Sequence, residues 1–503
     1  MSNPGELPEQ TNQLRKNSLG VAAVTFLVVS AAAPLTAVAG GVPLSMLLGN
    51  GPGIPLTFLI VTGVLLMFSV GYVAMARHIR NAGAFYAFTA QGLGGLMGGA
   101  AALLAILAYN AMQIGVFGLF GAATSGFMAS LGLDLPWWAW TYIGIAAVAV
   151  LGYRRVDLSA RVLTVLVVLE YLVVLVIDAA ILFSGGDSGL TMEPFTPSAF
   201  LSGTPAIGIL FCFAAFIGFE ATTIYSEEAR DPGRTVPRAT YISVLIIGIF
   251  YMLTAWLMVN GAGAGKLVGE LQALQDPTTF LFGLAERYVG HWIIPVMNLL
   301  FVTSLFAGVV AFHNGVARYM YVAGREGLLP RGLGVTHPQY QSPHVGSIVQ
   351  TAIAITVVGI FAVTGQDPVL ALFSWATNVG TLAIMLLMTF TAFAIIAFFC
   401  APSGAGKQPL HHARPASGDG HHPWPSGDLY CRQFRQPCRC KRLHGRVPAG
   451  PCAGGGDCGP AACIAAQGHQ CRGLRPAGRR TGRLTAEIPA LSHKEGALSA
   501  FAI

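Results

Sequence analysis

The stretch LGVAAVTFLVVSAAAPLTAVAGGVPLSMLL, residues 19–48, decides the fold. It contains no charged side chain, and none occurs in the whole interval between Lys16 and Arg77. A helix needs only about 20 apolar residues to cross a bilayer. The stretch is also much longer than the apolar core of a signal peptide. We therefore expect it to remain in the protein as a membrane helix.

The composition of the whole chain favours the same environment. Of 503 residues, 54% are hydrophobic and only 10% are charged, whereas a soluble domain usually has about 25% charged residues. The net charge of +7 is confined to the end of the chain, because residues 1–400 sum to −2 and residues 401–503 to +9. We therefore expect membrane lipids around most of the chain, and no nucleic-acid partner.

Apolar windows separated by charged or Gly/Pro-rich breaks predict ten transmembrane helices. Lys and Arg gather in alternate connections, and short connections rich in these residues stay in the cytoplasm during insertion. We therefore expect a multi-pass protein of the cytoplasmic membrane whose N-terminal segment, residues 1–18, is cytoplasmic. The predicted helices cover residues 19–48, 52–76, 92–125, 137–153, 158–183, 204–227, 240–261, 292–320, 347–363 and 369–399.

Two of the predicted helices contain interruptions. Pro34 lies in the middle of the first helix, where it lacks an N–H and clashes with the preceding turn. The sixth helix has a small-residue stretch that ends at Gly218. Interrupted backbone at membrane depth is tolerated only where protein buries it or where it lines a wet cavity. Paired interruptions therefore indicate the central site of a transporter, although Pro and Gly are frequent in single membrane helices as well.

Three stretches, in this order, resemble the amino acid–polyamine–organocation (APC) superfamily of permeases. They are NAGAFY at 81–86, FIGFE at 216–220 with EEARDPGRTVPRA at 227–239, and ARY at 317–319 followed by GREGLLP at 324–330. The resemblance implies an all-α integral membrane fold with an inverted five-plus-five helix repeat, about residues 19–190 and 200–400, with broken helices 1 and 6. It also implies a secondary transporter of amino acids or small amines by alternating access, often proton-coupled, with an exchanger as the alternative.

The resemblance further implies that the substrate lies between helices 1 and 6, near helices 3, 8 and 10. The helix 1 segment looks like a cradle for a carboxylate, although its alanines stand where many relatives have glycine. The helix 6 segment looks like the ammonium side, with Phe216 as the preferred gating ring. The substrate-binding candidates are Ala31, Ala32, Ala33, Pro34, Leu35, Thr36, Phe213, Ala214, Phe216, Ile217 and Gly218.

Glu170, in the predicted fifth helix, is the candidate for proton coupling. An ionisable group at membrane depth is costly enough to be a functional hypothesis by default. A carboxyl there can take up and release a proton as access alternates, and a structural carboxyl bonded to a neighbouring helix is an equal alternative. We expect Asp178, nearer the outer end, to be solvated or structural, and Glu220 to belong to a polar network rather than to contact the substrate.

Other residues carry weaker hypotheses. We expect His313 to be a satisfied core histidine, and the spacing of Gly95 and Gly99 suits close helix packing rather than a phosphate loop.

The sequence contains no cluster of catalytic or metal-binding groups in its membrane part, so we expect neither an enzyme nor a metal or cofactor. A cytoplasmic ion-pair network is expected to gate the inner mouth, with a plain solvated loop as the alternative, and it comprises Glu227, Glu228, Arg230, Arg234 and Arg238.

From residue 401 onwards the apolar pattern stops, and Gly, Pro, Arg, His and Cys dominate. A zinc module is one interpretation, but no CxxC or HxxxH spacing of a structural site occurs in the tail. Members of the superfamily commonly continue with two more helices. We expect a shifted reading frame, with a disordered cytoplasmic tail as the second interpretation, and a truncated, non-functional permease stays open.

The reading-frame hypothesis predicts a simple result at the level of the gene. Translation downstream of codon 400 in the two alternative frames should show two apolar windows of about 20 residues each, because each missing helix must span the bilayer. If neither frame contains such windows, the hypothesis is contradicted and the tail is a genuine extension.

Overall fold

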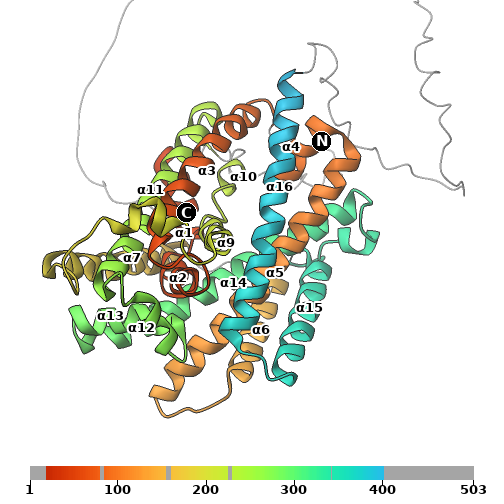
Figure 1. Cartoon of the computed structure of the whole chain (residues 1–503). Coiled ribbons are helices and arrows are strands. Elements are labelled where there is room, and N and C mark those ends of the chain that lie inside the picture. The colour runs from red at the N-terminus through yellow and green to blue at the C-terminus, as the bar shows by residue number, and fades with distance from the viewer. Residues whose placement is uncertain (1–18, 80–83, 155–159, 225–228, 341, 401–503) are drawn as a thin grey trace, which may run out of the picture. The chain divides into compact units, whose positions relative to one another are not determined.

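The computed structural model describes residues 19–79, 84–154, 160–224, 229–340 and 342–400. Within these ranges the chain forms helices and no β-strand, and a single isolated bridge joins Leu19 to Ala229. Figure 1 shows the helices in chain order from red to blue. The all-α fold that the resemblance implies is therefore confirmed.

The structure has one to three helical segments in each of the ten predicted ranges. Eight of the ranges contain one long helix, and the last of these is preceded by the π-helical segment η8 (Pro368–Phe373). The long helices are α3 (Ile54–Ala76), α5 (Gly95–Ser130), α6 (Trp137–Arg154), α7 (Ala160–Ser184), α11 (Pro232–Ala262), α14 (Ile294–Arg325), α15 (His344–Val363) and α16 (Ser374–Cys400).

Seven helical stretches in the described part are long and apolar enough to cross a membrane. Six of them correspond to α3, α5, α11, α14, α15 and the pair η8 and α16, and the seventh is Thr164–Ser184 of α7. Shorter apolar helices occupy Val21–Ser30, Thr36–Leu48 and Pro205–Ala214. The chain is therefore a multi-pass membrane protein.

The first and the sixth predicted ranges are interrupted. In the first, α1 (Val21–Ala31) ends before Ala33, whose φ is +44°, and the π-helical η1 (Thr36–Gly41) leads into α2 (Val42–Leu48). In the sixth, α9 (Pro205–Ala214) is followed by turns and by the short α10 (Ala221–Ile224), with Gly218 at φ +114°. The inverted symmetry between the two halves stays a prediction.

The third predicted range begins differently from our expectation. Gly94, at φ +90°, separates α4 (Ala84–Leu93) from α5, so residue 92 belongs to α4. The expected close packing at Gly95 is wrong, because a Cβ built there has no atom within 4 Å. The close contact is instead at Gly98, where a Cβ would lie 2.4 Å from the Cβ of Ala90. The turn at Gly94 brings α4 back against α5.

Short helical segments lie between the long helices. Two of them, η2 and η6, overlap the starts of the second and eighth predicted ranges, and the others lie in predicted connections. Lys266, just before α12, donates to the Asp187 carboxylate at 2.7 Å and thereby lowers the pKa of that carboxyl. The Lys266 side chain is exposed and the Asp187 side chain is partly exposed, so this surface ion pair contributes little stability. The segments are η2 (Gly51–Gly53), η3 (Glu193–Phe195), α8 (Pro197–Phe200), α12 (Leu267–Ala273), η5 (Pro277–Thr279), α13 (Phe280–Tyr288), η6 (His291–Ile293) and η7 (Arg331–Gly334).

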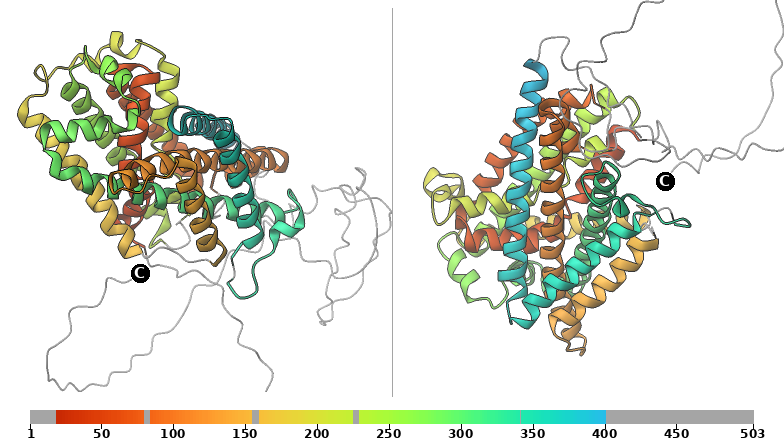
Figure 2. Two further views of the ribbon diagram at one scale, coloured as in Figure 1. Left: turned by 90° about the horizontal axis from the view of Figure 1, so that it is seen from below. Right: turned by 90° about the vertical axis from the view of Figure 1, so that its right-hand side faces the viewer.

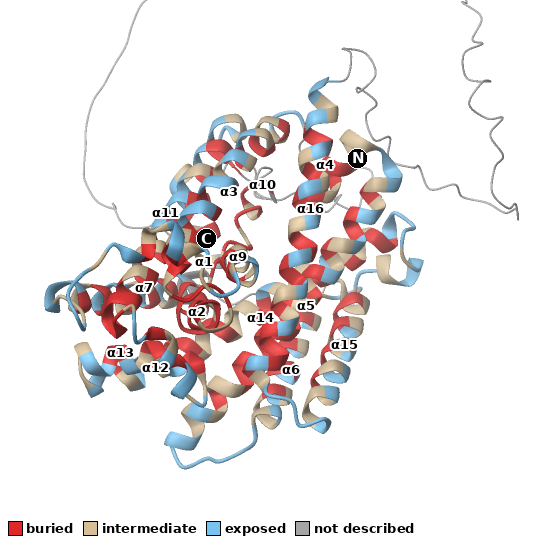
Figure 3. Ribbon diagram, in the orientation of Figure 1, coloured by how far each residue is buried: buried red, intermediate tan, exposed pale blue. Residues whose placement is uncertain are grey.

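The outer faces of the long helices are apolar. Met67 on α3 is 78% exposed, and Val363 at the end of α15 is 90% exposed. Figure 3 shows buried residues on the faces where helices meet and exposed residues on the outside. Large apolar surfaces of this kind mark contact with a membrane or a partner, and in a multi-pass protein they face lipid. α5 lies among α4, α6, α14 and α16 (Figures 1 and 2).

We predict that Gly121→Ala in α5 lowers the thermal unfolding temperature of the detergent-solubilised protein. A Cβ at Gly121 would lie 2.0 Å from Thr141 Oγ1 and 2.7 Å from the carbonyl oxygen of Trp137 in α6. Overpacking of this kind costs about 1–3 kcal/mol. The matched control is Gly126→Ala in the same helix, where a Cβ meets no atom within 4 Å. Equal unfolding temperatures for the two variants would contradict the close α5–α6 contact.

Candidate functional site

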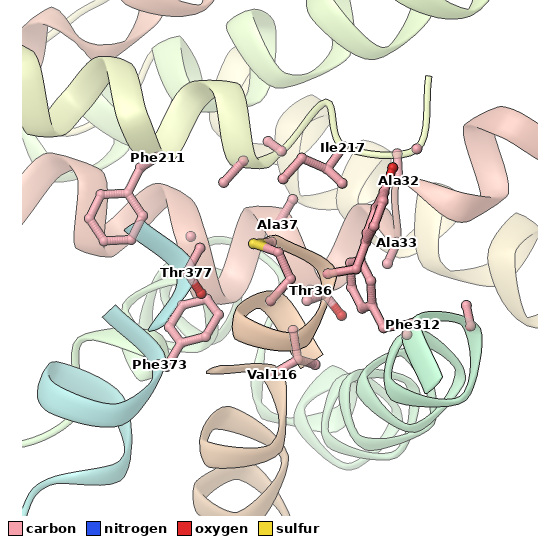
Figure 4. A pocket seen from close by; sticks show the side chains of 18 of the residues that line it. Ala32, Ala33, Thr36, Ala37, Val116, Phe211, Ile217, Phe312, Phe373 and Thr377 are labelled. Atoms are coloured by element: carbon pink, nitrogen blue, oxygen red, sulfur yellow. The ribbon is translucent and has the colours of Figure 1, made fainter. Parts of the chain in front are cut away.

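A cavity of about 220 Å³ lies between the two interrupted segments (Figure 4). Its wall is mostly apolar, with one carboxylate and a few hydroxyl groups. The first segment contributes Ala32, Ala33, Thr36, Ala37, Gly41, Val42 and Ser45, and the second contributes Phe211, Ala214, Ala215, Ile217, Gly218, Glu220 and Ala221. The remaining lining residues are Phe58, Tyr109, Met112, Val116, Gly308, Ala311, Phe312, Gly315, Tyr319, Phe373 and Thr377.

Side chains from two other helices satisfy backbone groups that the first interruption frees. Tyr251 of α11 donates its hydroxyl to the carbonyl oxygen of Ala32 at 3.0 Å. The backbone N–H of Leu35 donates to Glu170 Oε2 of α7 at 3.3 Å. A backbone polar group left unpaired at membrane depth costs several kcal/mol. These two contacts therefore hold the interruption in place.

Glu170 is connected to the cavity by hydroxyl groups. The carboxyl is buried, with 2% of the residue exposed, and Oε2 also accepts a hydrogen bond from Ser304 Oγ of α14 at 2.8 Å. Ser304 Oγ in turn lies 3.0 Å from Thr36 Oγ1, and Thr36 lines the cavity. A continuous chain of hydrogen bonds thus runs from the buried carboxyl through two hydroxyls to the cavity wall.

The second interruption has a buried carboxylate of its own. Glu220 Oε2 accepts a hydrogen bond from the backbone N–H of Gly218 at 2.9 Å, and Tyr109 of α5 donates its hydroxyl to Glu220 Oε1. Glu220 is only 3% exposed, yet it lines the cavity, as do Tyr109 and the Tyr319 ring stacked on it at 5.5 Å. The expected network around Glu220 is confirmed by these bonds.

The structure brings six of the eleven predicted substrate-binding residues to the cavity wall. Four others, Pro34, Leu35, Phe213 and Phe216, are not among the lining residues, and the side chain of Ala31 lies outside the described part. Phe216 is buried against Phe58 and Tyr251, and the centroid of its ring lies 6.4 Å from the ring centroid of each. Of these three rings, Phe58 lines the cavity. The lining six are Ala32, Ala33, Thr36, Ala214, Ile217 and Gly218.

Of the predicted cytoplasmic gate, only the three arginines lie in the described part of the chain. Glu227 and Glu228 lie outside the described residues. Arg234 forms an exposed ion pair with Asp231, Nε to Oδ2 at 3.7 Å, and such pairs contribute little. The backbone N–H of Arg230 donates to the carbonyl oxygen of Leu19 at 2.8 Å and joins the start of α1 to the segment before α11. The gate stays a prediction.

Asp178 and His313, two further buried polar residues of the membrane part, have structural partners. Asp178 Oδ2 accepts a hydrogen bond from Thr254 of α11 at 2.7 Å. His313 Nε2 lies 2.7 Å from Ser347 Oγ, and its Nδ1 lies 3.4 Å from Gln113 Nε2. The expectation that His313 is a satisfied core histidine is therefore confirmed. In the described ranges no group of three or more His, Cys, Asp or Glu residues could hold a metal ion.

Sequence reasoning missed the face of α14 that lines the cavity. Five lining residues follow the i, i+3, i+4, i+7 spacing of one helix face, and they are Gly308, Ala311, Phe312, Gly315 and Tyr319. That face is less bulky than a lipid-facing one, because small residues occupy three of the five positions. The helical spacing of small residues in the eighth predicted range was the available signal.

Comparisons with known proteins identify relatives of this chain. The family described as amino acid permease matches residues 19–410. The branched-chain amino acid permease BcaP of Bacillus subtilis (strain 168) is 26% identical over 319 residues, which are 59% of this chain and 65% of that protein. The low-affinity putrescine importer PlaP of Escherichia coli (strain K12) is 25% identical over 315 residues, which are 60% of this chain and 66% of the importer.

The chain thus spans less than two thirds of the length of either relative. Among solved structures, a mutant of the manganese transporter of Eremococcus coleocola has a TM-score of 0.49 and 18% sequence identity. The match covers 77% of this chain and 81% of that one.

Proposed function

The chain belongs to the amino acid permease family, and we propose that it carries amino acids or related small amines across the cytoplasmic membrane by alternating access. It is a membrane transporter rather than an enzyme. The observation that carries the proposal is the cavity between the two helix interruptions. Helix ends at such interruptions supply backbone N–H and C=O groups to a charged substrate in the middle of the membrane.

The chemistry of the cavity wall favours a small substrate with an amine and an apolar body. Glu220 supplies negative charge, and its neighbour Tyr109 supplies a hydroxyl oxygen that can accept from an ammonium. We place the substrate carboxylate at the start of η1, where Thr36 lines the cavity, because a helix N-terminus favours an anion whereas the end of α1 presents carbonyl groups. We place the apolar side chain among residues such as Met112. The two relatives are named for branched-chain amino acids and for putrescine, and both kinds of molecule carry amines.

The interruptions also supply the hinges that alternating access needs. Ala33 and Gly218 have positive φ values of +44° and +114°, and segments on either side of such points can tilt separately.

We propose residues 19–400 as the permease core with the N-terminus in the cytoplasm, and residues 401–503 as a tail outside that core. Phe216 is proposed to act on the gate through Phe58, on which it packs.

Proton coupling is proposed to act through Glu170. The ionised carboxylate accepts hydrogen bonds from Leu35 N–H in the first interruption and from Ser304. A protonated carboxyl carries a hydrogen of its own and accepts these bonds less strongly. Proton uptake therefore loosens the contact between α7 and the first interruption. In this way the charge on Glu170 is linked to the position of the helix that binds the substrate.

The function is tested by uptake into vesicles that contain the purified full chain. Radiolabelled branched-chain and other neutral amino acids, and putrescine, are offered with and without an imposed pH gradient. Accumulation driven by the gradient supports proton-coupled transport, whereas uptake that needs the same amino acid inside the vesicle identifies an exchanger. Failure of every substrate to enter faster than into empty vesicles would contradict the proposal.

We predict that Glu170→Gln abolishes the dependence of uptake on the pH gradient while substrate binding stays measurable. The amide keeps the size and an acceptor oxygen for Leu35 but does not change its charge between pH 5 and 8. The matched control is Asp178→Asn, which alters another buried acid of α7 that contacts α11 and not the first interruption. A gradient dependence that survives in Glu170→Gln, or is lost equally in both variants, would rule out the role.

A further inference from the structure

A second hollow lies away from the central cavity, between α6 and α15. Its volume is about 460 Å³. Its long walls are apolar and are formed by Ala149 and Val150 of α6 and by Ile348, Ala352 and Ile355 of α15. Val150, Ile348 and Ile355 are 54%, 55% and 45% exposed, so no other described part of the chain covers the hollow. Figures 1 and 2 show the two helices side by side.

One end of this hollow is polar and charged. Tyr153 and Arg154, the last two positions of α6 to line it, face Ser347 near the start of α15. The Arg154 side chain is exposed and forms no ion pair with a carboxylate of the described residues. At the other end, Tyr142 of α6 donates its hydroxyl to the carbonyl oxygen of Ile355 at 3.3 Å and joins the two helices. The hollow is therefore a groove with a single cationic end.

We propose that this groove binds an anionic phospholipid of the leaflet on the Arg154 side. The apolar walls match an acyl chain. The exposed guanidinium, which pairs with no carboxylate of the described ranges, matches a phosphate, to which Arg can donate two parallel hydrogen bonds. Basic pockets between membrane helices on the cytoplasmic side bind anionic headgroups in this way. A free anion would use Arg154 alone and would leave the five apolar wall residues without a role. A soluble partner would not reach walls that lie within the membrane span.

The groove is connected to the transport site by a buried polar chain. Ser347 lines the groove and lies 2.7 Å from His313 of α14, and His313 lies 3.4 Å from Gln113 of α5. Phe312 and Met112, the neighbours of these two residues, line the central cavity. A lipid that holds α6 and α15 together therefore supports the helices that form the cavity wall. Lipid binding should raise the thermal stability of the whole protein.

The test measures thermal unfolding of the purified full chain in detergent during titration with phosphatidylglycerol. Phosphatidylcholine with the same acyl chains and inorganic phosphate are titrated in parallel. We expect phosphatidylglycerol to raise the unfolding temperature at much lower concentration than either. Equal effects of the two lipids would show ordinary lipid contact, and an equal effect of inorganic phosphate would show a free-anion site. Either result would overturn the proposal.

Variants locate the site. Arg154→Gln should weaken phosphatidylglycerol binding about fivefold, since one arginine near a charged membrane surface contributes about that factor, and Arg154→Lys should retain most of it. The control is Arg331→Gln, an exposed cation of η7 outside the groove. Ala352→Leu narrows the groove wall without removing charge and should weaken binding as well. Unchanged binding in both Arg154→Gln and Ala352→Leu would overturn the assignment.

Discussion

The need to pair the backbone of the first interruption shapes the whole structure. Lipid offers no hydrogen bonds to the groups that α1 frees when it ends at Ala31, so protein must supply them. Tyr251 and Glu170 do so from two different helices, α11 and α7. These contacts fix where the three helices meet. The cavity lies at this point because the interrupted backbone cannot be packed as closely as a continuous helix.

The second interruption follows the same physical rule with another acid. Glu220 accepts the N–H of Gly218, as Glu170 accepts the N–H of Leu35. The two acids differ in what they face: Glu220 lines the cavity, whereas Glu170 reaches it only through Ser304 and Thr36. This difference fits the roles that we propose, in which Glu220 binds the substrate amine and Glu170 takes up and releases the proton.

The sequence could predict the helices and the places where they break, because apolar length and the chemistry of Pro and Gly are local properties. It could not predict which side of a helix faces the cavity. Phe216 belongs to the right segment but packs behind Phe58, and Tyr109 was missed although it bonds to Glu220. That pair is separated by 111 residues, and only tertiary packing brings such residues together. Conversely, Gly95 had the right spacing for close packing but faces open space.

The central claim, that the cavity between the interruptions is the substrate site, is tested most directly by filling it. Gly308 of α14 lines the cavity, and a Cβ there meets only Val116 Cγ1 at 3.9 Å, so Gly308→Leu adds a side chain to open space. The comparison is Gly126→Leu, at an exposed position of α5 with no atom within 4 Å. The account predicts that Gly308→Leu loses labelled amino-acid uptake at an unchanged unfolding temperature, while Gly126→Leu keeps it. Normal uptake by Gly308→Leu would contradict the account.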